Sequence, residues 1–116
     1  MSESIGDLIA NYRRHAAEHG AATEAGDHKE GNAHHDRLIE VVGALRRRGA
    51  EGDHALLDLL SDENPWVRIW AATHSLTIDE AQAHRTLDSL STEPGIIGFD
   101  AQMVLTEWEK GSLRIP

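Results

Sequence analysis

Residues 56–72, LLDLLSDENPWVRIWAA, decide the fold of this 116-residue chain. The first part is a leucine-rich segment with the spacing of a helix face, and it runs into the turn Asp62-Glu63-Asn64-Pro65. Pro65 suits the first position of a new helix, where its missing N–H has no partner to lose. The new helix gathers its core-facing residues on one side: Val67, Trp70, Ala71 and His74. The stretch predicts two short helices packed as a hairpin.

Helical spacing and capping signals continue on both sides of this hairpin. Ser2 or Ser4 can cap the first helix, and β-type alternation is absent. We therefore predict one all-α domain of about six helices, with a helical hairpin at 1–50, two helix pairs at 53–111 and a tail at 112–116. The first predicted helix runs from about Ile5 to a stop at Gly26, and the second from Asp27 to about Arg48. The third is capped by Asp53, and the fourth runs from Pro65 to about Leu76. The fifth is capped by Asp79 and broken by Pro94-Gly95, and the sixth runs from about Ile97 to Gly111.

Two helix pairs repeat at an interval of 30 residues, because Val67 matches Ile97 and Ala71 matches Ala101. The leucine-rich helix, the Asp62 turn, Val67-Arg68 and Ala71-Ala72 resemble a HEAT repeat, clearest at 54–76. The resemblance implies a short α-α superhelix. Asp62 is expected to accept backbone N–H groups in the turn, and Arg68 to reach that carboxylate or a neighbouring one. The residues expected to be structural are Asp62, Arg68, Trp70, His74 and Trp108.

Four segments are also similar to a family of small, uncharacterised bacterial HEAT-like proteins: residues 32–36 (NAHHD), 64–74 (NPWVRIWAATH), 97–101 (IGFDA) and 107–111 (EWEKG). The match covers most of the chain. The family has no established activity, so the resemblance supports the fold and supplies almost no chemistry. Its members occur in bacterial toxin–immunity gene neighbourhoods, which implies a role in binding a protein.

The charge of the chain is negative and lies in its second half. The formal net charge is −9, of which residues 1–50 carry −1 and residues 51–116 carry −8. Such a surplus excludes a nucleic-acid binder, which needs cations to replace counterions at phosphates. The chain has no cysteine, no apolar run of membrane-spanning length and no signal-peptide pattern, so we expect a cytoplasmic protein without a membrane partner.

The histidines raise the question of metal chemistry. His15-Ala16-Ala17-Glu18-His19 has the H-x-x-E-H spelling of inverted zincins, but the chain is too small for a protease scaffold, and His19 lies on the apolar stripe. His34 and His35 point about 100° apart on a helix and cannot share a metal by themselves. We expect His74 to be buried and neutral, and the 46–48 arginine cluster to be a solvated helix end. No catalytic residue, metal ligand or cofactor is predicted, and the chain is expected not to be an enzyme.

Protein binding is the predicted function, most concretely as an immunity-type protein that neutralises a basic toxin domain such as a nuclease. The alternative is a structural or scaffold domain with a neutral partner. Trp66 is either an anchor for a basic partner beside Glu63 or a packing partner of Trp70. In HEAT-type stacks the second helix of each pair forms the binding face. The candidate partner-binding residues are Glu63, Trp66, Ile69, Thr73, Gln102, Thr106 and Glu109.

Overall fold

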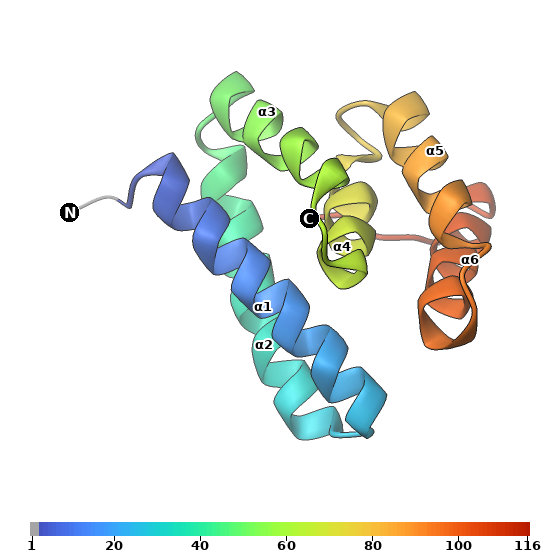
Figure 1. Ribbon diagram of the computed structural model, residues 1–116. Coiled ribbons are helices and arrows are strands. Elements are labelled where there is room, and N and C mark those ends of the chain that lie inside the picture. Colours follow the sequence, from blue (N-terminus) through green and yellow to red (C-terminus); the bar gives the residue numbers. More distant parts are fainter. Residues whose placement is uncertain (1–2) are drawn as a thin grey trace.

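The computed structural model describes residues 3–116, which form six α-helices and no β-strand. This confirms the predicted all-α class and the number of helices (Figure 1). None of these helices combines the length and apolar character that a bilayer span requires. The elements are α1 (Ile5–Ala25), α2 (His28–Arg46), α3 (Ala50–Asp58), the short 3-10 turn η1 (Leu59–Ser61), α4 (Pro65–Ser75), α5 (Glu80–Leu90) and α6 (Gly95–Glu109).

Most helix ends follow from the capping residues in the sequence. Ser4 caps α1 in a reciprocal capping box with Asp7, whereas Ser2 lies outside the described residues. Gly26 ends α1 in the left-handed conformation, at φ 72°, and its N–H bonds to carbonyls of the last turn. The Asp27 side chain then accepts the N–H of Glu30 and starts α2. The connection between the two long helices is therefore very short.

The start of the third helix was predicted wrongly. α3 begins at Ala50, with Gly49 before it at φ 61°, a conformation that favours glycine. Asp53 is not the cap, because its own N–H already bonds to the carbonyl of Gly49 within the first turn. The acids Glu51 and Asp53 lie instead inside that turn, where the positive end of the helix dipole stabilises them.

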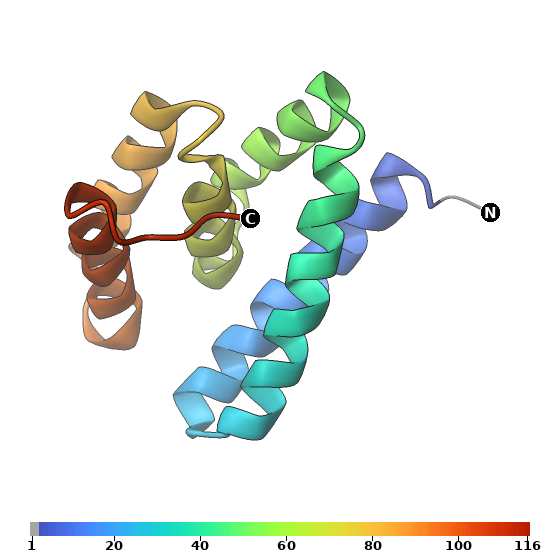
Figure 2. The ribbon, with the colours of Figure 1, turned by 180° about the vertical axis from the view of Figure 1, so that it is seen from behind.

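α4 is the central helix of the molecule. α1 and α2 run antiparallel as a long hairpin, and α4 contacts α1, α3, α5 and α6 (Figure 1). Behind α4, the segment after α6 returns across the molecule towards α2, as Figure 2 shows. Leu113 and Ile115 of this segment pack against the core. The predicted tail is therefore part of the packed structure.

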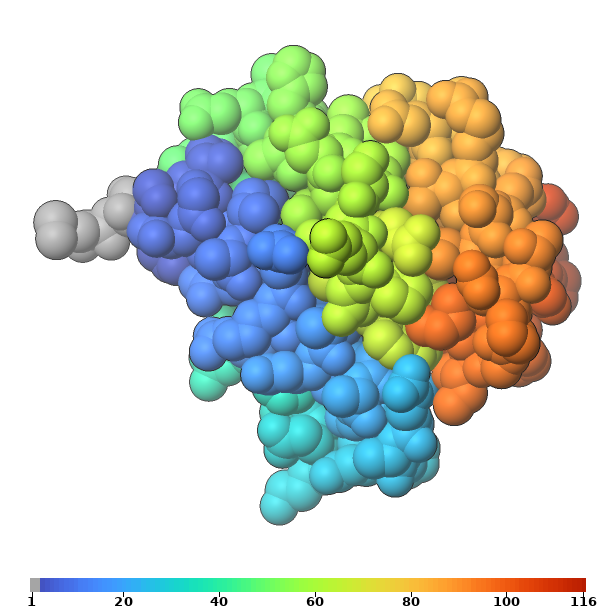
Figure 3. Space-filling model, in the orientation of Figure 1, coloured from blue at the N-terminus to red at the C-terminus, as the bar shows by residue number. Residues whose placement is uncertain are grey.

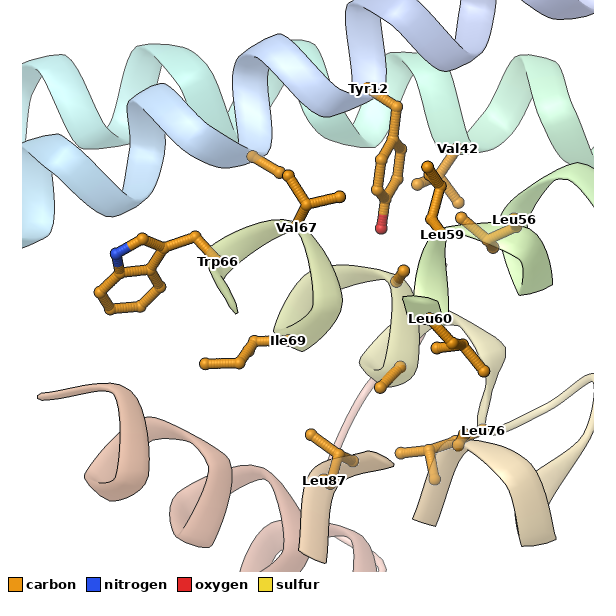
Figure 4. Packing of buried hydrophobic residues seen from close by; sticks show 14 of the residues in the cluster. Tyr12, Val42, Leu56, Leu59, Leu60, Trp66, Val67, Ile69, Leu76 and Leu87 are labelled. Carbon is orange, nitrogen blue, oxygen red and sulfur yellow. The ribbon is translucent and has the colours of Figure 1, made fainter. Parts of the chain in front are cut away.

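The core lies where α4 meets the other helices (Figure 4). Tyr12 projects from α1 towards α4, near Val42 and Leu56. The positions that repeat at 30 residues serve this core, since Val67, Ala71 and Ala101 are buried and Ile97 is half-buried. Small residues at two of these positions let the helices approach closely.

One of the expected structural contacts differs from the prediction. Asp62 does accept a turn N–H, that of Asn64, but its ion pair is with Arg13 of α1, at 2.7 Å between Nε and Oδ1. The expected bond between Asp62 and Arg68 is wrong, because Arg68 lines a hollow beside α5 with Arg85, and its Nε has no hydrogen-bond partner among residues 3–116. Trp108 packs half-buried against the core.

The predicted solvated arginine cluster is also partly wrong. Arg46 donates to the backbone carbonyl of His74 at 2.8 Å and to that of Pro116 at 3.0 Å. Arg48 donates to the carbonyl of Glu3, while Arg47 is exposed as expected. The fold brings distant carbonyls to the end of α2, and this proximity is absent from the sequence pattern.

Candidate functional site

Among residues 3–116, three large apolar side chains are exposed, and all of them belong to α6. Ile96, Phe99 and Met103 are 41%, 60% and 43% exposed. Their spacing of three and four residues places them on one side of the helix. We refer to these three residues as the exposed α6 face. Single exposed apolar residues are ordinary on protein surfaces, but an apolar cluster is typical of a binding site.

A groove between α4 and α6 adjoins this face. It encloses about 230 Å³, and its exposed surface is mostly apolar. Figure 3 shows the molecule from the side on which α4 lies between the end of α1 and the α5–α6 pair. We call it the α6 groove, and its lining residues are His19, Trp66, Ile69, Trp70, Thr73, Asp100, Met103, Val104 and Leu113.

Asp100 is the one carboxylate that residues 3–116 contribute to the lining of this groove. The side chain is partly buried, and burial raises the pKa of its carboxyl group. It makes no hydrogen bond or ion pair with any residue in the part of the chain that the structure describes. A carboxylate in such a place gains free energy when a cation enters beside it.

Trp66 does not stand at the rim of the stack as a surface anchor. It is only 6% exposed, and its indole lies over Gly20 of α1. Its Nε1–H donates to the carboxylate of Glu24 at 2.9 Å. The close approach of α1 and α4 at Gly20 buries this ring, so the interpretation of Trp66 as an exposed anchor beside Glu63 is wrong.

The other candidate binding residues fall into two groups. Ile69 and Thr73 were expected to face the open surface, but they are 4% and 7% exposed because α6 packs over their helix. They form the inner wall of the α6 groove, and Figure 4 shows Ile69 directed to that side. The remaining candidates are exposed: Glu63, Gln102, Thr106 and Glu109. Gln102 and Thr106 adjoin the exposed α6 face.

His74 lies in the core, as predicted. The Tyr12 hydroxyl is 2.7 Å from its Nδ1, and the Trp70 indole stacks on its ring with centroids 5.5 Å apart. Burial lowers the pKa of His74 to about 3, and the charges of Arg46 and His35 act in the same direction. Burial also raises the pKa of Tyr12. His74 is therefore neutral at physiological pH.

A second group of histidines lies between α1 and α2. Nδ1 of His15 is 3.0 Å from Nδ1 of His34. Nε2 of His34 is 3.2 Å from a Glu18 oxygen and 3.1 Å from a Glu30 oxygen. Burial, followed by the charge of Arg14, lowers the pKa of His15. We call these four residues the His15–His34 cluster.

His19 is not the partner of His15 that the H-x-x-E-H spelling suggests. Its ring packs edge-on against Trp70, at 5.1 Å between centroids, and near His35 at 6.1 Å. Burial lowers the pKa of His19, and its Nδ1 has no hydrogen-bond partner within residues 3–116. The inverted-zincin interpretation therefore has no geometric support.

Three features escaped the sequence analysis: the pairing across the α1–α2 hairpin, the exposed α6 face and the contact between Trp66 and Glu24. The pairing of histidines across the hairpin does have a sequence signal, because residues equally distant from the turn at Gly26 face each other. This rule places His19 opposite the His34–His35 doublet and His15 within about one helical turn of it. The exposed α6 face also has a signal, because its members lie off the apolar stripe of that helix. The contact between Trp66 and Glu24 has no signal in the sequence that we can identify.

These features define an all-α, cysteine-free helical domain with a mostly apolar groove that contains one carboxylate. The chain belongs to the family described as domain of unknown function DUF2019, whose model matches residues 6–108. It is similar in fold to the crystal structure of the protein RPA1889 from Rhodopseudomonas palustris CGA009, with a TM-score of 0.87 and 22% sequence identity over 99% of this chain and 96% of that one. No curated protein matches the sequence.

Proposed function

We propose that this chain is a non-enzymatic protein-binding module, and that the α6 groove and the exposed α6 face bind a basic partner protein. The observation that carries the proposal is Asp100, a partly buried carboxylate without a partner among the described residues, in a groove that is otherwise mostly apolar. A lysine or arginine side chain of the partner would pair with this carboxylate. Its aliphatic stem would lie against Trp70, whose ring also favours a cation.

The exposed α6 face supports the proposal because it offers apolar contacts to a partner protein. Phe99 and Met103 are residue types enriched at protein interfaces, and binding would remove them from water. Burying such a side chain completely from full exposure contributes roughly 1.5–3 kcal/mol, and Phe99 and Met103 would gain the share that corresponds to their exposed fraction. The groove and the face share Met103, so that one partner surface would cover both.

Charge supports a basic partner over a neutral one. Asp100, Glu107 and Glu109 lie within α6, which contains no lysine or arginine. The half of the chain that contains α4, α5 and α6 carries −8. A field of one sign speeds the encounter with an oppositely charged surface and makes the encounter sensitive to salt.

The specific form that we propose is a HEAT-like immunity-type protein that neutralises a basic toxin domain, for example a nuclease. The arrangement of the groove supports it, because α4 and α6 are the second helices of the two repeated pairs. An acidic, apolar surface would also cover the cationic site that a nuclease presents to nucleic acid.

The first experiment identifies the partner at the proposed surface. A photo-crosslinking phenylalanine analogue replaces Phe99 in cells of the source organism, and a matched variant carries it at exposed Lys29 on α2. We expect a covalent adduct with a basic protein from position 99 and none from position 29. Equal adducts from both positions, or an acidic protein from position 99, would overturn the proposal.

The second experiment measures the affinity of the purified partner for the parent chain and for two variants. We expect Phe99→Ser and Asp100→Asn each to weaken binding about tenfold or more, and added salt to weaken the parent complex. Loss of affinity in Phe99→Ser alone, without salt dependence, would instead support the scaffold alternative with a neutral partner. Unchanged affinity in both variants would exclude the α6 surface.

A further inference from the structure

We infer that the α1–α2 hairpin carries a divalent-metal site, best suited to zinc, formed by Nδ1 of His15, Nδ1 of His34 and the carboxylate of Glu18. One ligand atom from each of these residues lies within 4.8 Å of the other two. Two imidazoles and a carboxylate are a ligand set that zinc takes in proteins. The inference is independent of the α6 surface.

The spacing of the two histidine nitrogens fits a shared ion. With Zn–N bonds of about 2.0–2.1 Å and tetrahedral angles, two ligand nitrogens lie about 3.3 Å apart. Nδ1 of His15 and Nδ1 of His34 are already 3.0 Å apart. The ligands come from two helices that the short turn at Gly26 and Asp27 holds together. The carboxylate of Glu18 is now 3.2 Å from Nε2 of His34, and it would turn to the Nδ1 side of that ring to complete the site.

Without metal, the cluster forms a chain of hydrogen bonds with one acceptor too many. A guanidinium only donates, so Arg14 donates to Nε2 of His15, at 3.3 Å, and the ring hydrogen of His15 is on Nδ1. That N–H faces Nδ1 of His34, whose own hydrogen is then on Nε2. This single N–H faces two carboxylates, those of Glu18 and Glu30. One of the two is surplus.

The surplus carboxylate gives each acid a role once the ion binds. Glu30 keeps the Nε2–H of His34 and so fixes which ring nitrogen faces the metal, a common outer-shell arrangement. Glu18 is free to become the third ligand. On His15 the hydrogen moves from Nδ1 to Nε2, a change of tautomer without loss of a proton, and the Arg14 contact is released.

Accessibility and charge also favour an ion at this place. The side chain of His34 is 15% exposed and that of Glu18 is 49% exposed, so the site has a path from solvent. The carboxylates of Glu18 and Glu30 offset the charge of a divalent cation, against the positive charges of Arg14 and Arg37 near His15. Three protein ligands leave a fourth position for water or for a side chain of another molecule.

The test uses the full chain without an affinity tag, stripped with a chelator and exchanged into chelator-free buffer. Zn²⁺ is titrated by calorimetry, and Co²⁺ is added separately as an optical probe of tetrahedral coordination. We expect one ion per chain, a tetrahedral Co²⁺ spectrum and a melting temperature that rises with Zn²⁺ concentration.

Matched variants assign the ligands. We expect His15→Gln and His34→Gln each to lower Zn²⁺ affinity more than tenfold, and Glu18→Gln and Glu30→Gln about tenfold. His54→Gln, on the exposed side of α3, is the control and should bind as the parent does. Glu18 and Glu30 are exposed, so their variants test the site even if a histidine variant fails to fold, which circular dichroism reveals.

Three results would overturn the inference. They are no stoichiometric Zn²⁺ in the parent, parental affinity in the Glu18 and His15 variants, and a loss confined to a His35→Gln variant, which would place the ion at the neighbouring His19–His35 pair. Loss of Zn²⁺ binding with unchanged binding at the α6 groove would leave the proposed function intact.

Discussion

The imidazole of His74 links burial in the core to the pH dependence of folding. Its ring contacts Tyr12 from α1 and Trp70 from its own helix, and the charge of Arg46 from α2 lies close by. The sequence indicated a buried neutral histidine on the core face of its helix. It did not indicate the tyrosine as partner, because the two residues are 62 positions apart.

We predict that the free energy of unfolding falls by about 2 kcal/mol between pH 7 and pH 5 on account of His74 alone. The unfolded ring takes up a proton near pH 6.5, whereas burial holds the folded pKa at about 3. Protonation therefore favours the unfolded chain throughout this interval. The full contribution of neutral His74 to the free energy of unfolding is present only above about pH 6.5.

Urea denaturation at several pH values measures this effect in the parent, in His74→Asn and in His54→Gln. The asparagine oxygen can accept the Tyr12 hydroxyl in place of Nδ1. Between pH 7 and pH 5, the free energy of unfolding should fall by about 2 kcal/mol less in His74→Asn than in the parent. In His54→Gln, an exposed control, it should fall as much as in the parent. The lowered pKa values of His15 and His19 act in the same direction, so only the difference between variants reports His74. Equal slopes in all three proteins would contradict the assignment.

Among the helices, the crossing of α1 and α4 depends on the absence of a side chain at Gly20. A Cβ there would lie 2.1 Å from Cγ of Trp66, well inside any tolerated contact. The helix ends were predictable because capping is local: Ser4, Asp27 and Pro65 act within one turn of their own positions. The crossing of α1 and α4 was not predictable, because a glycine within a helix does not show in the sequence which residue packs on it.

We predict that Gly20→Ala destabilises the fold by roughly 1–3 kcal/mol, because the indole of Trp66 must shift to admit a methyl group. The matched control is Gly43→Ala in α2, where a Cβ would meet only the flexible end of Arg47 at 3.6 Å. That change should be neutral or stabilising by up to about 1 kcal/mol. Chemical denaturation of both variants measures the difference, and equal stabilities would show that the indole does not depend on Gly20.

Over the molecule as a whole, Arg46 connects three parts of the chain that are far apart in sequence. Its guanidinium joins the end of α2 to the carbonyl of His74 at the end of α4 and to that of Pro116 in the returning segment. Leu113 and Ile115 of this segment pack against the core on the way. The segment therefore closes one side of the molecule rather than extending from it.

We predict that Arg46→Gln loosens the segment after α6 and accelerates tryptic cleavage after Arg114 several-fold. Arg47→Gln, a neighbouring exposed position, serves as the control and should leave the rate unchanged. Mass spectrometry of timed digests under native conditions measures both rates. An unchanged rate in Arg46→Gln would show that the apolar contacts of Leu113 and Ile115 hold the segment by themselves.

The sequence by itself determined the helical class, the number of helices, most of their ends and the place of the negative charge. These properties depend on local spacing, capping and composition, which act over a few residues. Tertiary structure alone decided that Trp66 is buried over Gly20, that Arg13 rather than Arg68 pairs with Asp62, and that the Nδ1 atoms of His15 and His34 come within 3.0 Å of each other. Such contacts join residues from different helices, and their geometry depends on how closely and at what register those helices pack. The candidate sites of this protein lie at such junctions, between α4 and α6 and between α1 and α2.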